Sequence, residues 1–224
     1  MKLRNSLMAM CMALLGIGLS SCLDDNNDTP STGTGTDIAV LTGLSDNSAS
    51  FVVTTVENTT VNLYCNEAGL IDKEKFPVGS RVFITYNLLY GQNTNLPVKI
   101  TLLSIKPVTV VSLDEATSPD DIALKYSAFS IGTTYIAGDY INIIASLNRN
   151  DKRTWQCYLD PATSSGEEAN IYLELKDEGK TESIGTTEIV SINIGSLRDK
   201  YKQIIMHANT NKGPGYEYKY VVNN

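Results

Sequence analysis

From Ile38 onward, apolar and polar residues alternate along the chain with a period of two. The clearest run places Val82, Ile84, Tyr86 and Leu88 on one face of a strand. Alternation over five or more positions is typical of β-strands that bury one face. The same alternation returns at residues 141–147, 171–175, 190–194 and 216–222. No segment sustains the i, i+3, i+4, i+7 spacing of a long amphipathic helix, so the sequence predicts an all-β protein.

The first five strands are predicted before residue 107. They are expected at Ile38–Leu44, Ser50–Val56, Val61–Cys65, Arg81–Tyr90 and Val98–Ile105. In the last run the apolar phase slips between Leu102 and Leu103, which indicates a β-bulge. Five short strands with a bulge are typical of a small Greek-key barrel of the OB type. Because Lys106 and Pro107 break the pattern, we place an OB-like barrel domain at residues 38–107.

The remaining residues, 108–224, are predicted to form a β-sandwich domain. About eight further strand-like runs are separated by turns that contain Gly, Asn or Asp, a pattern typical of sandwiches. One helix-start signal stands out at Ser118–Asp121, where a capping hydroxyl precedes Pro119 and an acid follows at the third helical position. We expect a single helical turn there.

The N-terminal residues have the pattern of a bacterial secretion signal. Lys2 and Arg4 precede an apolar stretch at residues 7–19 that is too short to span a bilayer as a helix. Residues 19–22, Leu-Ser-Ser-Cys, resemble the lipobox of bacterial lipoproteins, in which cleavage falls before the cysteine. We therefore predict a signal peptide at residues 1–21 and lipidation of Cys22; the alternative is an ordinary secretory signal in which this cysteine is incidental. Two long acyl chains hold a protein on a bilayer essentially permanently.

Residues 22–37 are predicted to form an acidic, flexible tether behind the lipid. Leu23 is the single apolar side chain between residues 23 and 37, so this segment cannot bury enough surface to offset the entropy of ordering. Asp24, Asp25 and Asp28 resemble the acidic surface-export signal of Bacteroidetes lipoproteins. The alternative is that these carboxylates only solvate the linker.

Charge argues against one class of partner. Loss of Lys2 and Arg4 leaves 16 basic residues against 25 acidic ones, a net charge of −9 for the mature chain. Such a surplus repels phosphate backbones and provides no polybasic membrane signal. We therefore expect no nucleic-acid partner, and we expect membrane attachment through the N-terminal lipid, with a protein or a glycan as the ligand.

Two of the four cysteines stay available after processing, because Cys11 leaves with the signal and Cys22 carries the lipid. The other two, Cys65 and Cys157, lie on the apolar phase of alternating runs. We favour two buried thiols that behave as small hydrophobic side chains. A disulfide between them is the alternative in an oxidising compartment.

Candidate catalytic groups are sparse. His207 is the single histidine, which excludes a multi-histidine metal site, and its position on a strand favours a structural role. Glycoside hydrolysis needs two carboxylates across a cleft. The neighbouring acids that fit by type are Asp114–Glu115, Asp120–Asp121 and Glu167–Glu168. Because sequence neighbours on loops tend to point apart, we predict no catalytic residues, no metal site, no cofactor and no enzymatic activity.

Tyrosines give the one positive indication of a ligand surface. Tyr216, Tyr218 and Tyr220 share one face of the last predicted strand. Exposed, they would form a platform for a sugar ring or a partner protein. Because charged residues occupy the opposite face, burial in the core is the favoured interpretation. Trp155 is likewise expected in the core.

Three stretches carry a resemblance to a known family. They are PVGSRVFITYN at Pro77–Asn87, GDYINI at Gly138–Ile143 and NIYLEL at Asn170–Leu175. Behind a lipobox and an acidic tether, this order resembles the NigD-like lipoprotein family. The resemblance implies an N-terminal OB-like domain, a C-terminal β-sandwich, no catalytic residues, and association with a bacteriocin operon.

Together these features predict an outer-membrane lipoprotein that faces the cell exterior and acts as a non-catalytic binding or interaction protein. The alternative function is a glycan-binding accessory of a nutrient-uptake system, which requires the tyrosine face to be exposed.

Overall fold

A computed structural model describes residues 33–89, 97–126, 128–150, 152–177 and 181–222. In these ranges the regular structure is almost entirely β, which confirms the predicted fold class. The chain forms two compact units, with a break between Lys106 and Pro107; residues 54–60 group with the second unit. The predicted signal peptide, Cys22 and the acidic residues Asp24, Asp25 and Asp28 lie outside the described residues.

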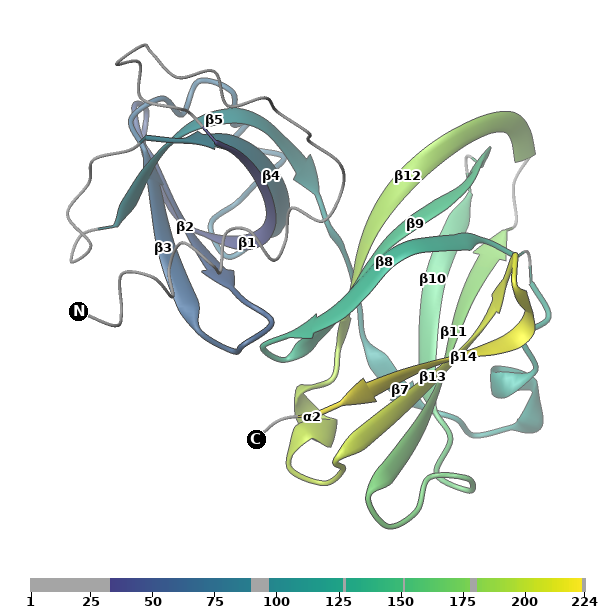
Figure 1. Cartoon of the computed structure of the whole chain (residues 1–224). Helices are drawn as coiled ribbons and strands as arrows, with labels where there is room; N and C mark the ends of the chain where they lie inside the picture. Colours follow the sequence, from purple (N-terminus) through teal and green to yellow (C-terminus); the bar gives the residue numbers. More distant parts are fainter. Residues whose placement is uncertain (1–32, 90–96, 127, 151, 178–180, 223–224) are drawn as a thin grey trace, which may run out of the picture. The chain divides into compact units, whose positions relative to one another are not determined.

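The first unit is a closed barrel of five strands (Figure 1). The strands are β1 (Thr34–Leu44), β2 (Ala49–Thr54), β3 (Thr60–Cys65), β4 (Arg81–Leu88) and β5 (Val98–Pro107). Their order around the barrel is β1-β2-β3-β5-β4, and β3 pairs with β5 in parallel. This closed five-stranded arrangement fits the OB-like barrel expected from the alternation of residues.

Strand β1 begins earlier than predicted. Thr34–Asp37 pair antiparallel with Ile84–Asn87 of β4, so these four residues extend the pairing of β1 with β4 that closes the barrel. The tether prediction is therefore wrong for residues 34–37. Backbone pairing with β4 stabilises them, although they contain no apolar side chain.

Alternate residues of the barrel strands fill its interior. Leu41, Phe51, Val82 and Ile84 are fully buried or nearly so. Leu102 is buried while Leu103 is 45% exposed, and Ile105 again packs against the core, so the inward phase shifts at the position of the predicted bulge.

The second unit is a sandwich of two mixed sheets (Figure 1). The five-stranded sheet has the order β14-β13-β11-β10-β7, and the four-stranded sheet has the order β6-β12-β9-β8. Their bounds are β6 Thr109–Val111, β7 Leu113–Glu115, β8 Ser130–Ala137, β9 Tyr140–Asn150, β10 Arg153–Leu159, β11 Glu168–Asp177, β12 Thr181–Asn193, β13 Gln203–Thr210 and β14 Gly213–Val221.

Residues from both sheets meet in one apolar core. Ile141 and Ile192 of the four-stranded sheet pack in the same cluster as Ile171 and Met206 of the five-stranded sheet. Two short helical segments complete the unit. The 3-10 helix η1 (Pro119–Ile122) forms the predicted turn, and α2 (Gly195–Arg198) buries Leu197.

Candidate functional site

Asp120 and Asp121, one of the three candidate carboxylate pairs, both bind residues close to them in the sequence. The Oδ2 atom of Asp121 accepts hydrogen bonds from the backbone N–H groups of Thr117 and Ser118, at 2.8 and 2.9 Å. These bonds lower the pKa of Asp121. Asp120 forms an ion pair with Lys125, at 2.8 Å. These two carboxylates therefore fix the turn that contains η1.

The other two pairs lie on different strands. Asp114 and Glu115 belong to β7, while Glu168 begins β11. Glu167 forms an exposed ion pair with Lys202.

His207 lies on β13 inside a hydrogen-bonded network. Its ring stacks on that of Tyr172 with centroids 4.6 Å apart, and its Nε2 lies 2.9 Å from Oδ1 of Asn170. Asn170 in turn donates to the carbonyl oxygen of Thr163, and the Thr163 hydroxyl donates to Asp160. Burial lowers the pKa of His207. The network holds the loop between β10 and β11 on the sheet, which supports the structural interpretation of this histidine.

The exposure of the three tyrosines on β14 decreases from Tyr216 through Tyr218 to Tyr220. Tyr216 is 39% exposed, Tyr218 is partly buried and Tyr220 is 8% exposed. The Tyr220 hydroxyl lies 2.7 Å from Oγ1 of Thr134 on β8, in the facing sheet. Burial raises the pKa of Tyr220. The favoured interpretation of a core residue is therefore confirmed for Tyr220, and the alternative of a three-ring platform is wrong at this residue.

The side-chain nitrogen of Lys212 lies close to the rings of Tyr216 and Tyr218. Nζ of Lys212 lies 4.7 Å from the ring centre of Tyr216 and 5.4 Å from that of Tyr218. The two rings meet edge to face with centroids 5.1 Å apart. Such cation–π contacts hold the rings against the hairpin between β13 and β14.

A buried polar cluster was missed by the sequence analysis. Trp155 is buried as predicted, but its indole N–H donates to Oε2 of Glu188, at 2.7 Å. The other carboxylate oxygen of Glu188 accepts from Arg153, at 2.9 Å, and the Arg153 side chain is 8% exposed. Periodicity places each of these residues on a face, but it does not reveal that two sheets bring them together.

A second buried carboxylate was also missed. Glu174 on β11 is 4% exposed and accepts a hydrogen bond from the backbone N–H of Lys125, at 3.2 Å. Burial raises the pKa of Glu174. This contact fixes the segment that follows η1 onto the outer side of the five-stranded sheet.

The two described cysteines are free and buried. Cys65 lies in the barrel core and Cys157 in the sandwich core, so the alternative of a disulfide is wrong. Burial raises the pKa of both thiols. Thiols in this protonated, inaccessible state are poor nucleophiles.

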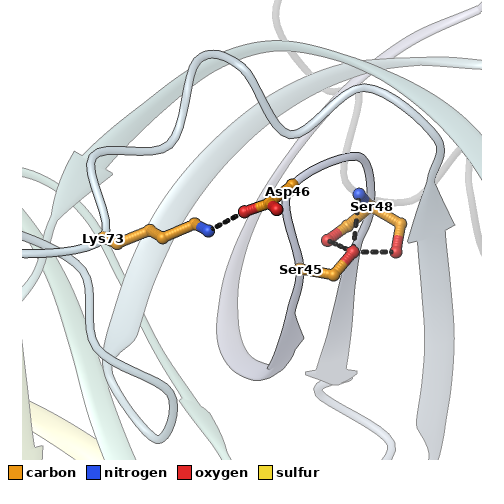
Figure 2. A network of polar contacts seen from close by, with 4 residues as sticks. All are labelled: Ser45, Asp46, Ser48 and Lys73. Carbon is orange, nitrogen blue, oxygen red and sulfur yellow. Dashed lines mark hydrogen bonds and ion pairs between the residues drawn. The ribbon is translucent and has the colours of Figure 1, made fainter.

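A polar network on the barrel fixes a turn. The hydroxyl oxygens of Ser45 and Ser48 lie 2.8 Å apart, and the backbone N–H of Ser48 donates to Oγ of Ser45, at 3.1 Å (Figure 2). Asp46, between them, pairs with Lys73, and both side chains are well exposed. These contacts close the β1–β2 hairpin and give no indication of a ligand site.

Two kinds of site are absent from the described residues. They contain no group of three or more His, Cys, Asp and Glu side chains arranged to hold a metal ion. Within the same ranges, no helix has the length and apolar character needed to cross a bilayer.

The class that this fold defines is a two-unit all-β protein with a closed five-stranded barrel followed by a β-sandwich. No family model matches the sequence, and no curated protein matches it. Solved structures do match over most of the chain. A protein of unknown function, DUF1344, from Bacteroides vulgatus has a TM-score of 0.66 at 15% identity, covering 86% of this chain and 92% of that one.

Two further solved structures connect the fold with the family suggested by the sequence. A NigD-like immunity protein from Bacteroides caccae has a TM-score of 0.59 at 14% identity, covering 88% of this chain and 100% of that one. A candidate lipoprotein from Bacteroides fragilis has a TM-score of 0.55 at 15% identity, covering 87% and 99%. The predicted resemblance to NigD-like proteins is thus confirmed in the fold.

Proposed function

We propose that this chain is a lipid-anchored protein of the bacterial outer membrane, displayed on the cell exterior, and that it acts as a non-catalytic binding or interaction protein. The observation that carries the proposal is the order of its N-terminal sequence. An apolar leader ends at Cys22, three aspartates follow within six residues, and the first strand begins at Thr34. The likeness in fold to a candidate lipoprotein supports this assignment.

The position of β1 limits how far the body can lie from the lipid. Because Thr34 is already paired with β4, only the chain between Cys22 and Thr34 is left as a spacer. Fully extended, this spacer spans at most about 40 Å. The binding surfaces would therefore operate close to the membrane.

Anchoring is tested with the full-length chain in a Bacteroides host. We expect Cys22→Ala to abolish incorporation of labelled palmitate and to remove the protein from the outer-membrane fraction. The matched control is Cys11→Ala, in the same leader, which should change neither. Retention of Cys22→Ala in the outer membrane would refute the anchor.

Surface display is tested separately, because it depends on different residues. Replacing Asp24, Asp25 and Asp28 with Asn should leave lipidation intact but protect the protein from protease added to intact cells. The control replaces Asn26 and Asn27 with Ala and should leave the protein accessible. Equal digestion of both variants would contradict the export role.

Association with a bacteriocin system is a finer part of the proposal. It is supported by the fold shared with a protein described as a NigD-like immunity protein. Deletion of the gene should then increase the sensitivity of the host to a bacteriocin from a related strain, and the wild-type gene should restore resistance. Unchanged sensitivity to a panel of such bacteriocins would remove this part.

The glycan-binding alternative is less well supported by the geometry. A sugar platform needs free aromatic ring faces, whereas Tyr220 is buried and Lys212 lies over the rings of Tyr216 and Tyr218. We therefore favour a protein ligand over a glycan.

A further inference from the structure

Strand β14 forms one edge of the five-stranded sheet. Among the described strands β13 is its only neighbour; β14 spans Gly213–Val221, and its pairing with β13 is regular over Tyr216–Val221, with a shift in register between Ala208 and Thr210 of β13. The opposite edge of the same sheet, β7, has three residues, as does β6 at one edge of the other sheet. The remaining edge strand, β8, is interrupted by a shift in register between Ile131 and Thr133. An edge as long as β14 is a template for pairing with another strand.

The position of β14 is fixed by contacts on its inner face. The Tyr220 hydroxyl is bound to Thr134 in the facing sheet, and Tyr218 packs against the sandwich core. The edge is therefore held in an extended, ordered form before any partner arrives, which lowers the entropic cost of pairing.

The outer face of β14 carries one acid and one base, two residues apart. Glu217 and Lys219 are both exposed, with 50% and 61% of their side-chain surface accessible, and their charged atoms lie 3.6 Å apart. Val221, on the same face, is 70% exposed, the highest value among the large apolar side chains of the described residues.

We propose that two copies of this chain pair antiparallel along β14, with Tyr218 on the two-fold axis. In this register Glu217 lies opposite Lys219 of the second copy, and the reverse pair forms by symmetry. The two five-stranded sheets then join into one continuous sheet through backbone hydrogen bonds between the two edges. The dimer does not depend on lipidation.

Charge selects this register over its neighbours. In antiparallel strands, directly opposed residues must point to the same face. An axis at Glu217 would oppose two carboxylates, and an axis at Lys219 would oppose two ammonium groups, both of which are destabilising. The axis at Tyr218 alone gives two opposite-charge pairs.

The same register places Tyr218 opposite its own copy and Val221 at the end of the paired segment. Val221 lies at the end of this register, beside Gly215 of the second copy, a residue with φ +67° that precedes the regular part of β14. Tyr218 pairs with Tyr218 of the second copy, which adds an aromatic cross-strand contact.

Cysteine cross-linking in intact cells tests the register. Two differently tagged full-length chains are co-expressed, one with Glu217→Cys and one with Lys219→Cys, and mild oxidant is added. We expect a disulfide-linked mixed dimer, because opposed positions have Cβ atoms about 5 Å apart. The control is Val110→Cys on β6, which is similarly exposed and should give no dimer. Absence of the mixed dimer, or a cross-link to another protein in its place, would overturn the proposal.

A charge swap tests the energetic argument with the purified full-length chain in detergent. Glu217→Lys should weaken the dimer about tenfold, because two attractive pairs become repulsive. The double variant Glu217→Lys/Lys219→Glu should restore the original dissociation constant, measured by light scattering after size-exclusion chromatography. Restoration also shows that the single variant did not simply misfold. A monomer at every concentration, or a double variant no better than the single one, would refute the interface.

Discussion

Near the start of β1, a carboxyl group is held by a tyrosine across the barrel seam. Asp37 accepts a hydrogen bond from the hydroxyl of Tyr86 on β4, at 2.6 Å. The ring reaches this position because Gly35 has no side chain: a Cβ atom there would lie 2.7 Å from Cζ of Tyr86. Burial raises the pKa of Asp37, and the hydrogen bond opposes this effect only in part.

The raised pKa predicts that Asp37 destabilises the barrel at neutral pH. The native state binds the proton more tightly than the unfolded chain, whose Asp pKa is 3.8. The stability that the bound proton adds to the folded barrel is therefore complete below pH 3.8 and is lost as the pH rises through the pKa of Asp37 in the folded state. We expect Asp37→Asn, which keeps an acceptor for Tyr86, to stabilise the barrel at pH about 7 and to flatten its dependence on pH. Hydrogen-exchange mass spectrometry of barrel peptides in urea measures this. A less stable variant at neutral pH would contradict it.

Between strands, one carboxylate joins the two sheets of the sandwich. Glu188 on β12 accepts hydrogen bonds from Trp155 and Arg153, both on β10. Since β10 and β12 belong to different sheets, these bonds fix the sheets against each other. The side chain of Arg153 is 8% exposed, and its guanidinium also donates to the backbone carbonyl oxygen of Asn148, at 2.5 Å.

Removal of this carboxylate should destabilise the sandwich far more than removal of a surface acid. We expect Glu188→Ala to lower the free energy of unfolding by about 2–3 kcal/mol, because a buried guanidinium and an indole N–H lose their acceptor. Glu188→Gln should cost less. The matched control is Glu167→Ala, which breaks an exposed pair with Lys202 and should change little. Urea unfolding followed by the fluorescence of Trp155, the single tryptophan, measures the sandwich directly. Equal losses of unfolding free energy in Glu188→Ala and Glu167→Ala would refute this role of Glu188.

For the molecule as a whole, the sequence predicts burial well where apolar and polar side chains alternate. It does not predict contacts that depend on pairing between distant parts of the chain. The phase of alternation correctly placed Cys65, Cys157 and Tyr220 in the cores. It could not reveal Glu188 beside Trp155, because these residues lie 33 positions apart in separate sheets. Pairing across sheets depends on the folded geometry rather than on local periodicity.

The predicted boundary between the tether and the barrel was wrong for a related reason. Thr34–Asp37 contain no apolar side chain, so their composition predicts a flexible segment. Their pairing partners lie about 50 residues later on β4, as in the contact between Asp37 and Tyr86. The composition of a short segment does not reveal a strand whose hydrogen-bond partners lie far away in the sequence.

Two truncations of the leaderless chain decide where the folded body begins. A chain that starts at Ile38 loses the pairing of Thr34–Asp37 with β4 and leaves the Tyr86 hydroxyl without its carboxylate. A chain that starts at Gly33 keeps both. Loss of these bonds should cost roughly 1–2 kcal/mol, so a maleimide should label Cys65, in the barrel core, about tenfold faster in the shorter chain. Cys157, in the sandwich core, is the internal control and should react equally in both. Equal labelling of Cys65 would mean that residues 34–37 add nothing to the barrel and serve only as spacer.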